Sequence, residues 1–89
     1  PGSSKVLTVF EEISAETLEI TIAPDSPAVG RSLADMKMPA GSVIGMLERD
    51  KTVLIPTGNS ILAAGDKVAI FASTEVMPLA IQKFGEISQ

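Results

Sequence analysis

Alternating apolar and polar residues run through much of the chain and predict β-strands. The alternation is clearest in ETLEITIA, residues 16–23. There Leu18, Ile20 and Ile22 alternate with threonine or glutamate, as in a strand buried on one face. Residues 6–10, VLTVF, have a spacing that also fits a helix, but valine, threonine and phenylalanine favour a strand. We therefore predict two strands near the start of the chain.

Three further strands are predicted in the second half of the chain. SVIGMLERD and TVLIP, residues 42–50 and 52–56, meet at the dipeptide Asp50-Lys51 and predict a tight hairpin. The turn TGNS follows, with glycine and asparagine tolerant of positive φ. DKVAIFAS, residues 66–73, is the last predicted strand.

Helical spacing is found in PDSPAVGRSLADM, residues 24–36, whose apolar residues fall on one face: Val29, Leu33 and Met36. Asp25 or Ser26 is the predicted N-cap, with Pro27 in the first turn. Because Gly30 weakens a continuous helix, its regular part is expected to begin near Arg31.

A second helix is predicted in TEVMPLAIQKFG, residues 74–85, with Thr74 as its cap, Pro78 near its first turn and Gly85 as its stop. The order of elements is then strands, helix, three strands, helix. This order predicts an α+β domain with a small mixed or antiparallel β-sheet and two short helices.

Length and composition limit the classes of function. The chain has 89 residues, enough for one modest core, and 45% of them are apolar. We interpret residues 1–4, PGSS, as a cloning remnant and residues 5–89 as a single domain cut from a larger protein. A net charge of −4 without a basic patch argues against a nucleic-acid surface. The absence of cysteine and histidine excludes thiol nucleophiles, imidazole bases and zinc fingers, so we do not expect an enzyme.

The adjacent acid and base in AAGDKV, Asp66 and Lys67, invite comparison with a catalytic pair. Neighbouring residues of an extended segment point to opposite faces, whereas proton transfer needs side chains that converge on one substrate. We therefore predict that Asp66 bonds the backbone beyond the turn at Gly65, and that Lys67 begins a strand.

Other charged residues offer two weaker candidates for a site. Arg31, near a helix start, and Arg49, at a strand end, are the best candidates for holding an anionic ligand, with salt bridging as the alternative. An acidic group lacks the spacing of a calcium loop and is interpreted as a solvated strand edge; it comprises Glu11, Glu12, Glu16 and Glu19. No metal site is predicted.

Residues 18–73 resemble, across their length, the C-terminal RCK domain, also called the TrkA-C domain. The features that carry the resemblance are the helix entry SPAVGRSLADM, the P-x-G loop before a strand ending in MLERD, and VLIPTGNSILAAGDKVAIF with its two turns. KVLTVFEEISAETLEITI is similar to the segment that leads into this domain in peripheral Trk potassium-uptake subunits. VMPLAIQKFG is similar to the closing helix of those subunits.

The resemblance implies a cytoplasmic regulatory domain at the inner face of the cell membrane. Such domains form homodimers and attach, as subunits or by fusion, to potassium channels, potassium-uptake systems or other cation transporters. They transmit ligand state to the gate by shifting dimer geometry. In Trk-type subunits a separate upstream domain binds nucleotide through a Gly-rich loop. This chain has no G-x-G-x-x-G, so no cofactor is expected in it.

The segment after the first predicted helix bears on two further possibilities. Some members of the family bind a small anionic ligand, a cyclic dinucleotide, through a polar stretch after the first helix. Here that stretch is residues 36–41, MKMPAG, which is mostly apolar and argues against this ligand. The tripeptide Met36-Lys37-Met38 also matches the one that holds the biotin-bearing lysine of biotin carrier domains, at the tip of a hairpin. The structural alternative is that Met36 and Met38 are core residues closing a helix, with Lys37 pointing to water. A biotinyl or lipoyl-type carrier domain with Lys37 modified is therefore the alternative function.

Overall fold

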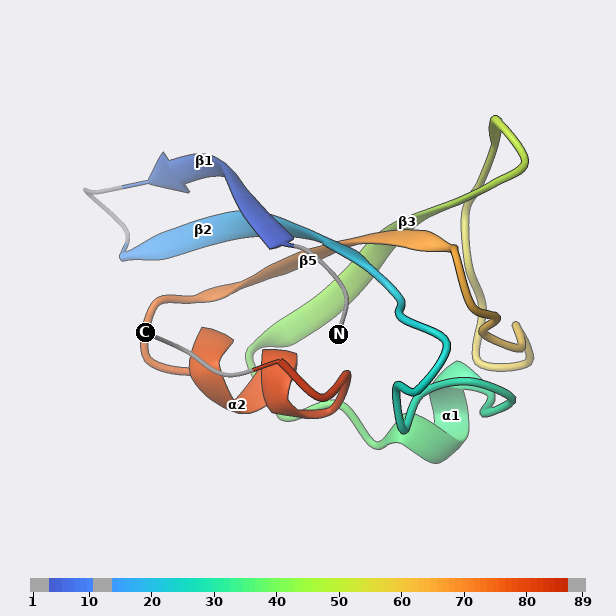
Figure 1. The fold of residues 1–89 in the computed structure, drawn as a ribbon. Helices are drawn as coiled ribbons and strands as arrows, with labels where there is room; N and C mark the ends of the chain where they lie inside the picture. Colours follow the sequence, from blue (N-terminus) through green and yellow to red (C-terminus); the bar gives the residue numbers. More distant parts are fainter. Residues whose placement is uncertain (1–3, 11–13, 87–89) are drawn as a thin grey trace.

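Five strands form one sheet in the computed structural model, which describes residues 4–10 and 14–86. Every pairing is antiparallel, and the spatial order is β1-β2-β5-β3-β4. Both helices lie on the same side of the sheet (Figure 1). The elements are β1 (Ser4–Phe10), β2 (Ala15–Thr21), α1 (Leu33–Met36), β3 (Ser42–Arg49), β4 (Thr52–Leu54), β5 (Lys67–Ser73) and α2 (Met77–Gln82). The predicted α+β class is confirmed.

The core lies between the sheet and the two helices. β5 is the central strand, and its Ile70 stands between Leu18 of β2 and Ile44 of β3 in one cross-strand row. The next row along β5 also consists of apolar side chains: Ile20, Val68 and Leu47. α1 contributes Met36 and the loop before β5 contributes Leu62, while α2 and the turn after it contribute Met77, Ala80, Ile81 and Phe84. Aliphatic side chains thus fill most of the core, as the near absence of aromatic residues requires.

The first helix is shorter than predicted. α1 is a single turn whose N-cap is Ser32, because the Ser32 hydroxyl accepts a hydrogen bond from the Asp35 amide at 3.1 Å. The predicted caps Asp25 and Ser26 are therefore wrong. Gly30 has a φ of 83°, which ends any helical path before Arg31.

The segment before α1 is folded into a series of turns and does not form a helix. Val29 is exposed, so it does not share the buried face of Met36. The Ser26 hydroxyl donates to the Phe84 carbonyl at 2.8 Å and ties this segment to the end of the chain. A Cβ at Gly85, whose φ is 84°, would lie 3.0 Å from the ring of Pro27. Gly85 is therefore required both by its backbone angle and by the close approach of Pro27.

The second helix begins later than its predicted cap. Val76 occupies the N-cap position of α2 without a side-chain hydrogen bond, so the prediction for Thr74 is wrong. The Ser73 hydroxyl instead accepts from the Val76 amide at 3.3 Å. Pro78 lies in the first turn, as predicted, where its missing N–H costs nothing.

The predicted hairpin between the third and fourth strands is confirmed. Asp50 and Lys51 have φ angles of 51° and 65°, the two consecutive left-handed residues of a type I′ turn. β4 ends at Leu54, earlier than predicted, and the chain then leaves the sheet toward Pro56. The hairpin projects away from the two helices (Figure 1).

The acidic residues are arranged differently from the predicted solvated edge. Glu16 and Glu19 belong to β2, which lies between β1 and β5, and both are half-buried. The prediction of an edge is therefore wrong for these two residues. Glu11 and Glu12 lie outside the described residues. Among the residues that are described, no group of three or more His, Cys, Asp or Glu side chains could hold a metal ion.

Candidate functional site

A cluster of polar contacts surrounds Asp66, in the turn that leads into β5. Its side chain is 1% exposed, and among the residues that the structure describes Asp66 is the one charged residue that is buried. Gly65, with a φ of 86°, reverses the chain just before it. The Ala63 amide donates to Oδ2 of Asp66 at 2.8 Å, and the Asp66 amide donates to the Ala63 carbonyl at 3.1 Å. The carboxylate therefore bonds the backbone of Ala63, on the far side of the turn at Gly65.

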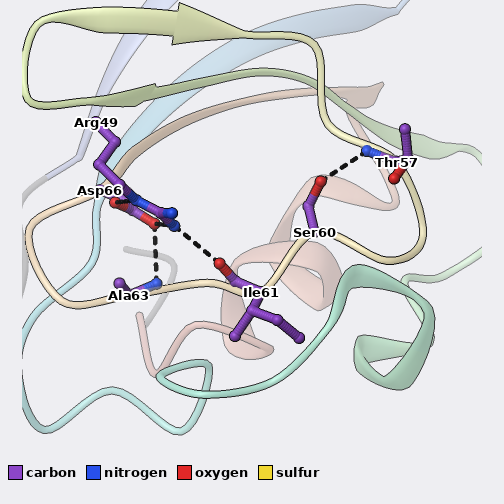
Figure 2. A network of polar contacts seen from close by, with 6 residues as sticks. All are labelled: Arg49, Thr57, Ser60, Ile61, Ala63 and Asp66. Atoms are coloured by element: carbon purple, nitrogen blue, oxygen red, sulfur yellow. Dashed lines mark hydrogen bonds and ion pairs between the residues drawn. The ribbon is translucent and has the colours of Figure 1, made fainter.

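Arg49, the last residue of β3, binds this carboxylate through two of its nitrogens (Figure 2). Its Nε donates to Oδ1 at 2.8 Å and its Nη2 donates to Oδ2 at 2.6 Å. Nη2 also donates to the Ile61 carbonyl at 2.8 Å. This bidentate, charge-assisted geometry is the strong form of an arginine–carboxylate contact. The pair joins the end of β3 to the loop before β5.

The same loop is held from its other side by the segment around α1. The Gly30 amide donates to the Leu62 carbonyl at 2.8 Å, and the Leu62 amide donates to the Arg31 carbonyl at 2.9 Å. The Leu33 amide donates to the Ser60 carbonyl at 3.0 Å. The Ser60 hydroxyl in turn accepts from the Thr57 amide at 2.9 Å (Figure 2). The loop is thus a rigid connection between α1 and the sheet.

Electrostatics fix the charge state of the pair. Burial by itself would raise the pKa of Asp66, but the hydrogen bonds from Arg49 and Ala63 and the charge of Arg49 together lower it below its ordinary value. The hydrogen bond to Asp66 raises the pKa of Arg49. Asp66 therefore stays ionised at neutral pH and is engaged on both oxygens, so it is not available as a general base.

The lowered pKa predicts a specific sensitivity to acid. The stability contributed by the Asp66 charge should be complete above the ordinary pKa of 3.8 and lost as the pH falls from there through the lower pKa of the folded state. Asp66→Asn removes that titration. Chemical unfolding of the unmodified chain and of the variant, from about pH 7 to about pH 3, measures the difference between their free energies of unfolding. This difference should become smaller only below about pH 4. A difference that does not change with pH would contradict a stabilising role for the Asp66 charge.

The predicted separation of acid and base is confirmed. Lys67 is exposed and begins β5, while Asp66 is buried on the other side of the backbone. The Arg31 side chain is directed to α1 instead, where its Nη2 donates to the Asp35 carbonyl. Arg31 and Arg49 border the same loop from opposite sides, through the backbone of Leu62 and Ile61. Anion binding by these two residues stays a prediction.

The surroundings of Arg49 are shallow. Its side chain remains 40% exposed beside a cavity of about 110 Å³, lined by Leu47, Arg49, Leu54, Pro56, Ser60 and Ile61. Pockets that enclose a small-molecule ligand usually measure about 300–1,000 Å³. This cavity beside Arg49 is therefore too small to enclose such a ligand within one copy of the chain.

Family comparison identifies the domain. A model of the TrkA-C domain matches residues 17–85, which include both helices, the Arg49–Asp66 pair, most of β2 and the whole of β3, β4 and β5. The chain belongs to the TrkA-C family. This is a regulatory family, not an enzyme family.

Relatives of this TrkA-C domain include two archaeal proteins. It is 35% identical over 85 residues to a Trk system potassium uptake protein TrkA homolog of Archaeoglobus fulgidus, covering 96% of this chain and 19% of the relative. It is 40% identical over 68 residues to Trk system potassium uptake protein TrkA homolog 1 of Methanosarcina mazei, covering 76% of this chain and 15% of the relative. The chain thus spans less than a fifth of the length of these relatives.

The fold agrees with a solved member of the wider RCK group. The crystal structure of the GsuK RCK domain superposes with a TM-score of 0.77 at 12% identity, covering 99% of this chain and 19% of that one. At this identity the match shows the fold alone. Within residues 4–10 and 14–86, no helix is long and apolar enough to cross a membrane.

The carrier alternative has no support in the geometry. Lys37 is the C-cap of α1, with a φ of 49°, and is exposed. A swinging cofactor requires its lysine at the tip of a hairpin, whereas Lys37 follows a helix and the tip of the β3–β4 hairpin is Asp50-Lys51. Met36, beside Lys37, is fully buried in the core, as the structural interpretation of this tripeptide predicts.

Sequence reasoning found Asp66 and Arg49 separately but missed their pairing. The two residues are 17 positions apart, and no local spacing joins them. The only available signal was the prediction that each lies at an end of a strand. Their contact requires β3 and β5 to be neighbours, although β4 and a long loop lie between them in sequence.

Proposed function

We propose that this TrkA-C domain is a regulatory module of a potassium-uptake system. The observation that carries the proposal is the match of residues 17–85 to the TrkA-C family, together with relatives named as Trk potassium uptake proteins. In this proposal the domain acts at the inner face of the cell membrane, through contact with a membrane-embedded transport subunit. Nucleotide binding belongs to a separate domain of the parent protein.

The proposed mechanism is a shift between dimer geometries. A homodimer of the domain would respond to any ligand or partner that binds one geometry better than another, and the linker would pass the change to the transporter. The rigid connection built by Arg49 and Asp66 supports such a role, since it makes α1, β3 and β5 move as one body. A displacement applied to one face would then reach the whole domain.

A small anionic ligand remains part of the proposal, with Arg31 and Arg49 as its contacts. The exposed part of the Arg49 side chain supports this, although two of its nitrogens already bind Asp66. Because the cavity beside Arg49 is small, such a ligand would need surfaces from two copies to be enclosed. A cyclic dinucleotide is the example that the resemblance offers.

A chimera tests the regulatory proposal. The segment of the Archaeoglobus fulgidus relative that matches this chain would be replaced by the 89 residues, and potassium uptake measured in cells that depend on that relative. We expect the chimera to restore uptake, whereas a version lacking the segment does not. Uptake no better than that of the deletion, despite equal accumulation of both proteins, would argue against the proposal.

A further inference from the structure

A second cavity, open to solvent, lies on the sheet and shares no lining residue with the cavity beside Arg49. Its volume is about 350 Å³, and it is lined by polar and charged residues: Ser4, Lys5, Glu19, Thr21 and Lys67. This volume falls within the range of about 300–1,000 Å³ that small-molecule sites usually occupy. The lining comes from three neighbouring strands, β1, β2 and β5. The cavity therefore has room for a small polar ligand.

The strand register places the charged side chains of this cavity on one face of the sheet. Lys5 of β1 lies opposite Glu19 of β2, and Thr21 of β2 lies opposite Lys67 of β5. Because Ile20, between Glu19 and Thr21, is buried in the core, these four side chains point away from the core. Both helices lie on the other side of the sheet (Figure 1). Two ammonium groups, one carboxylate and one hydroxyl thus border the cavity.

The charged groups around the cavity do not neutralise one another. Opposite charges on directly facing strand residues can pair and stabilise the sheet. Glu19 faces Lys5 and Glu48 faces Lys67, yet among the residues that the structure describes neither lysine forms an ion pair. β1 and β5 are separated by β2, which places them about 10 Å apart. The long, flexible side chains of the two lysines can therefore converge on one anionic group between them.

We propose that this cavity binds a small phosphomonoester that also carries hydroxyl groups, the chemistry of a polyol phosphate or a sugar phosphate. The ammonium groups of Lys5 and Lys67 hold the phosphate by charge-assisted hydrogen bonds. The Glu19 carboxylate only accepts hydrogen bonds, so it disfavours a bare anion and favours a ligand whose hydroxyl groups donate to it. The Thr21 hydroxyl can donate or accept. The site is separate from Arg31 and Arg49.

The two walls of the cavity differ in how firmly they are held. Beside Thr21 and Lys67, the Ile22 amide donates to the Asp66 carbonyl at 2.8 Å, so this wall is fixed to the turn that Arg49 holds. β1 has β2 as its one neighbour in the sheet, and their register is irregular. β1 also precedes residues 17–85, which match the TrkA-C model. A ligand held from both walls therefore ties the preceding segment to the centre of the domain.

Titration of the isotope-labelled 89-residue chain with glycerol phosphate tests the site, with amide chemical shifts recorded by two-dimensional NMR. We expect saturable shifts at the amides of Lys5, Glu19, Thr21 and Lys67. Methyl phosphate is the matched probe, because it is a phosphomonoester without hydroxyl groups. It should bind at least about threefold more weakly than glycerol phosphate, since it cannot donate a hydrogen bond to Glu19.

Two lysine variants separate a specific site from general attraction to positive charge. Lys67→Gln should raise the dissociation constant for glycerol phosphate by at least about tenfold, because it removes one charged partner of the phosphate. Lys51→Gln is the matched control. Lys51 is also exposed and loses the same charge, but it lies at the turn of the β3–β4 hairpin, outside the cavity. Its dissociation constant should change by less than about twofold.

A third variant tests the role assigned to the carboxylate. Glu19→Gln removes the negative charge while keeping an oxygen that accepts hydrogen bonds. Methyl phosphate should then bind more tightly than it does to the unmodified chain, because the repulsion from Glu19 is gone. The preference for glycerol phosphate over methyl phosphate should become smaller. Far-UV circular dichroism of each variant checks that the fold is retained.

Saturable shifts confined to the cavity, lost in Lys67→Gln and kept in Lys51→Gln, support the site. No saturable shift at tens of millimolar glycerol phosphate, or an equal loss in both lysine variants, overturns it, since the lysines would then be ordinary solvated charges. Methyl phosphate bound as tightly as glycerol phosphate, or an unchanged preference in Glu19→Gln, overturns the assignment of a hydroxyl-bearing ligand. The potassium-uptake chimera tests the regulatory role independently of these results.

Discussion

Asp66→Asn is expected to lower the free energy of unfolding by about 1–3 kcal/mol at neutral pH. The carboxylate accepts three hydrogen bonds, from Nε and Nη2 of Arg49 and from the Ala63 amide, and these are divided between its two oxygens. An asparagine has one acceptor oxygen and one NH₂ group. In either orientation its NH₂ would face at least one of these donors at a buried position.

Urea unfolding followed by far-UV circular dichroism measures this loss, since the chain has no tryptophan or tyrosine to serve as a fluorescent probe. Asp35→Asn is the control, because Asp35 is an exposed aspartate whose change should stay within about 0.5 kcal/mol. Equal unfolding midpoints for Asp66→Asn and the unmodified chain would mean that the pair does not stabilise the fold.

Leu62→Ala should destabilise the domain by about 2–5 kcal/mol. Leu62 lies in an irregular loop, yet its side chain is 1% exposed and belongs to the hydrophobic core. Its amide and carbonyl are both hydrogen-bonded to the segment before α1. The surrounding backbone is therefore fixed and cannot collapse easily into the space that the shorter side chain leaves.

The neighbouring residue provides the matched control. Ile61 is 53% exposed, and Arg49 binds its carbonyl, not its side chain. Ile61→Ala should therefore change the free energy of unfolding by less than about 1 kcal/mol in the same measurement. Similar losses for the two variants would show that the loop is not anchored through Leu62, and that its order comes from backbone contacts alone.

Several local features were predictable from the sequence. The alternation around Leu18 and Ile20 predicted the second strand, β2, and the apolar residues after Asp66 predicted the last strand, β5. The dipeptide Asp50-Lys51 predicted the turn of the β3–β4 hairpin, although neither residue is the glycine that positive φ angles favour. In each case the determining interactions are short-range: strand periodicity and turn geometry depend on residues within a few positions of one another.

Helix caps were the least predictable local features. Ser26, Ser32, Ser73 and Thr74 all have hydroxyl side chains suited to capping, and nothing local distinguishes among them. The structure selects Ser32 for α1, because Gly30 turns the chain and the Leu33 amide is held by the Ser60 carbonyl. Ser26 is instead held by the Phe84 carbonyl, 58 positions away. Long-range contacts thus decided where each helix could start.

The sequence by itself determined the fold class, most strand positions, the lack of residues for thiol, imidazole or zinc chemistry, and the resemblance to the TrkA-C domain. These depend on composition, short-range periodicity and the order of motifs along the chain. Only the tertiary structure decided that Asp66 is buried against Arg49, and that β3 pairs with β5 although β4 and a long loop lie between them in sequence. Sheet order brings residues together across many intervening positions, and it is set by how the whole core packs, which no local pattern records.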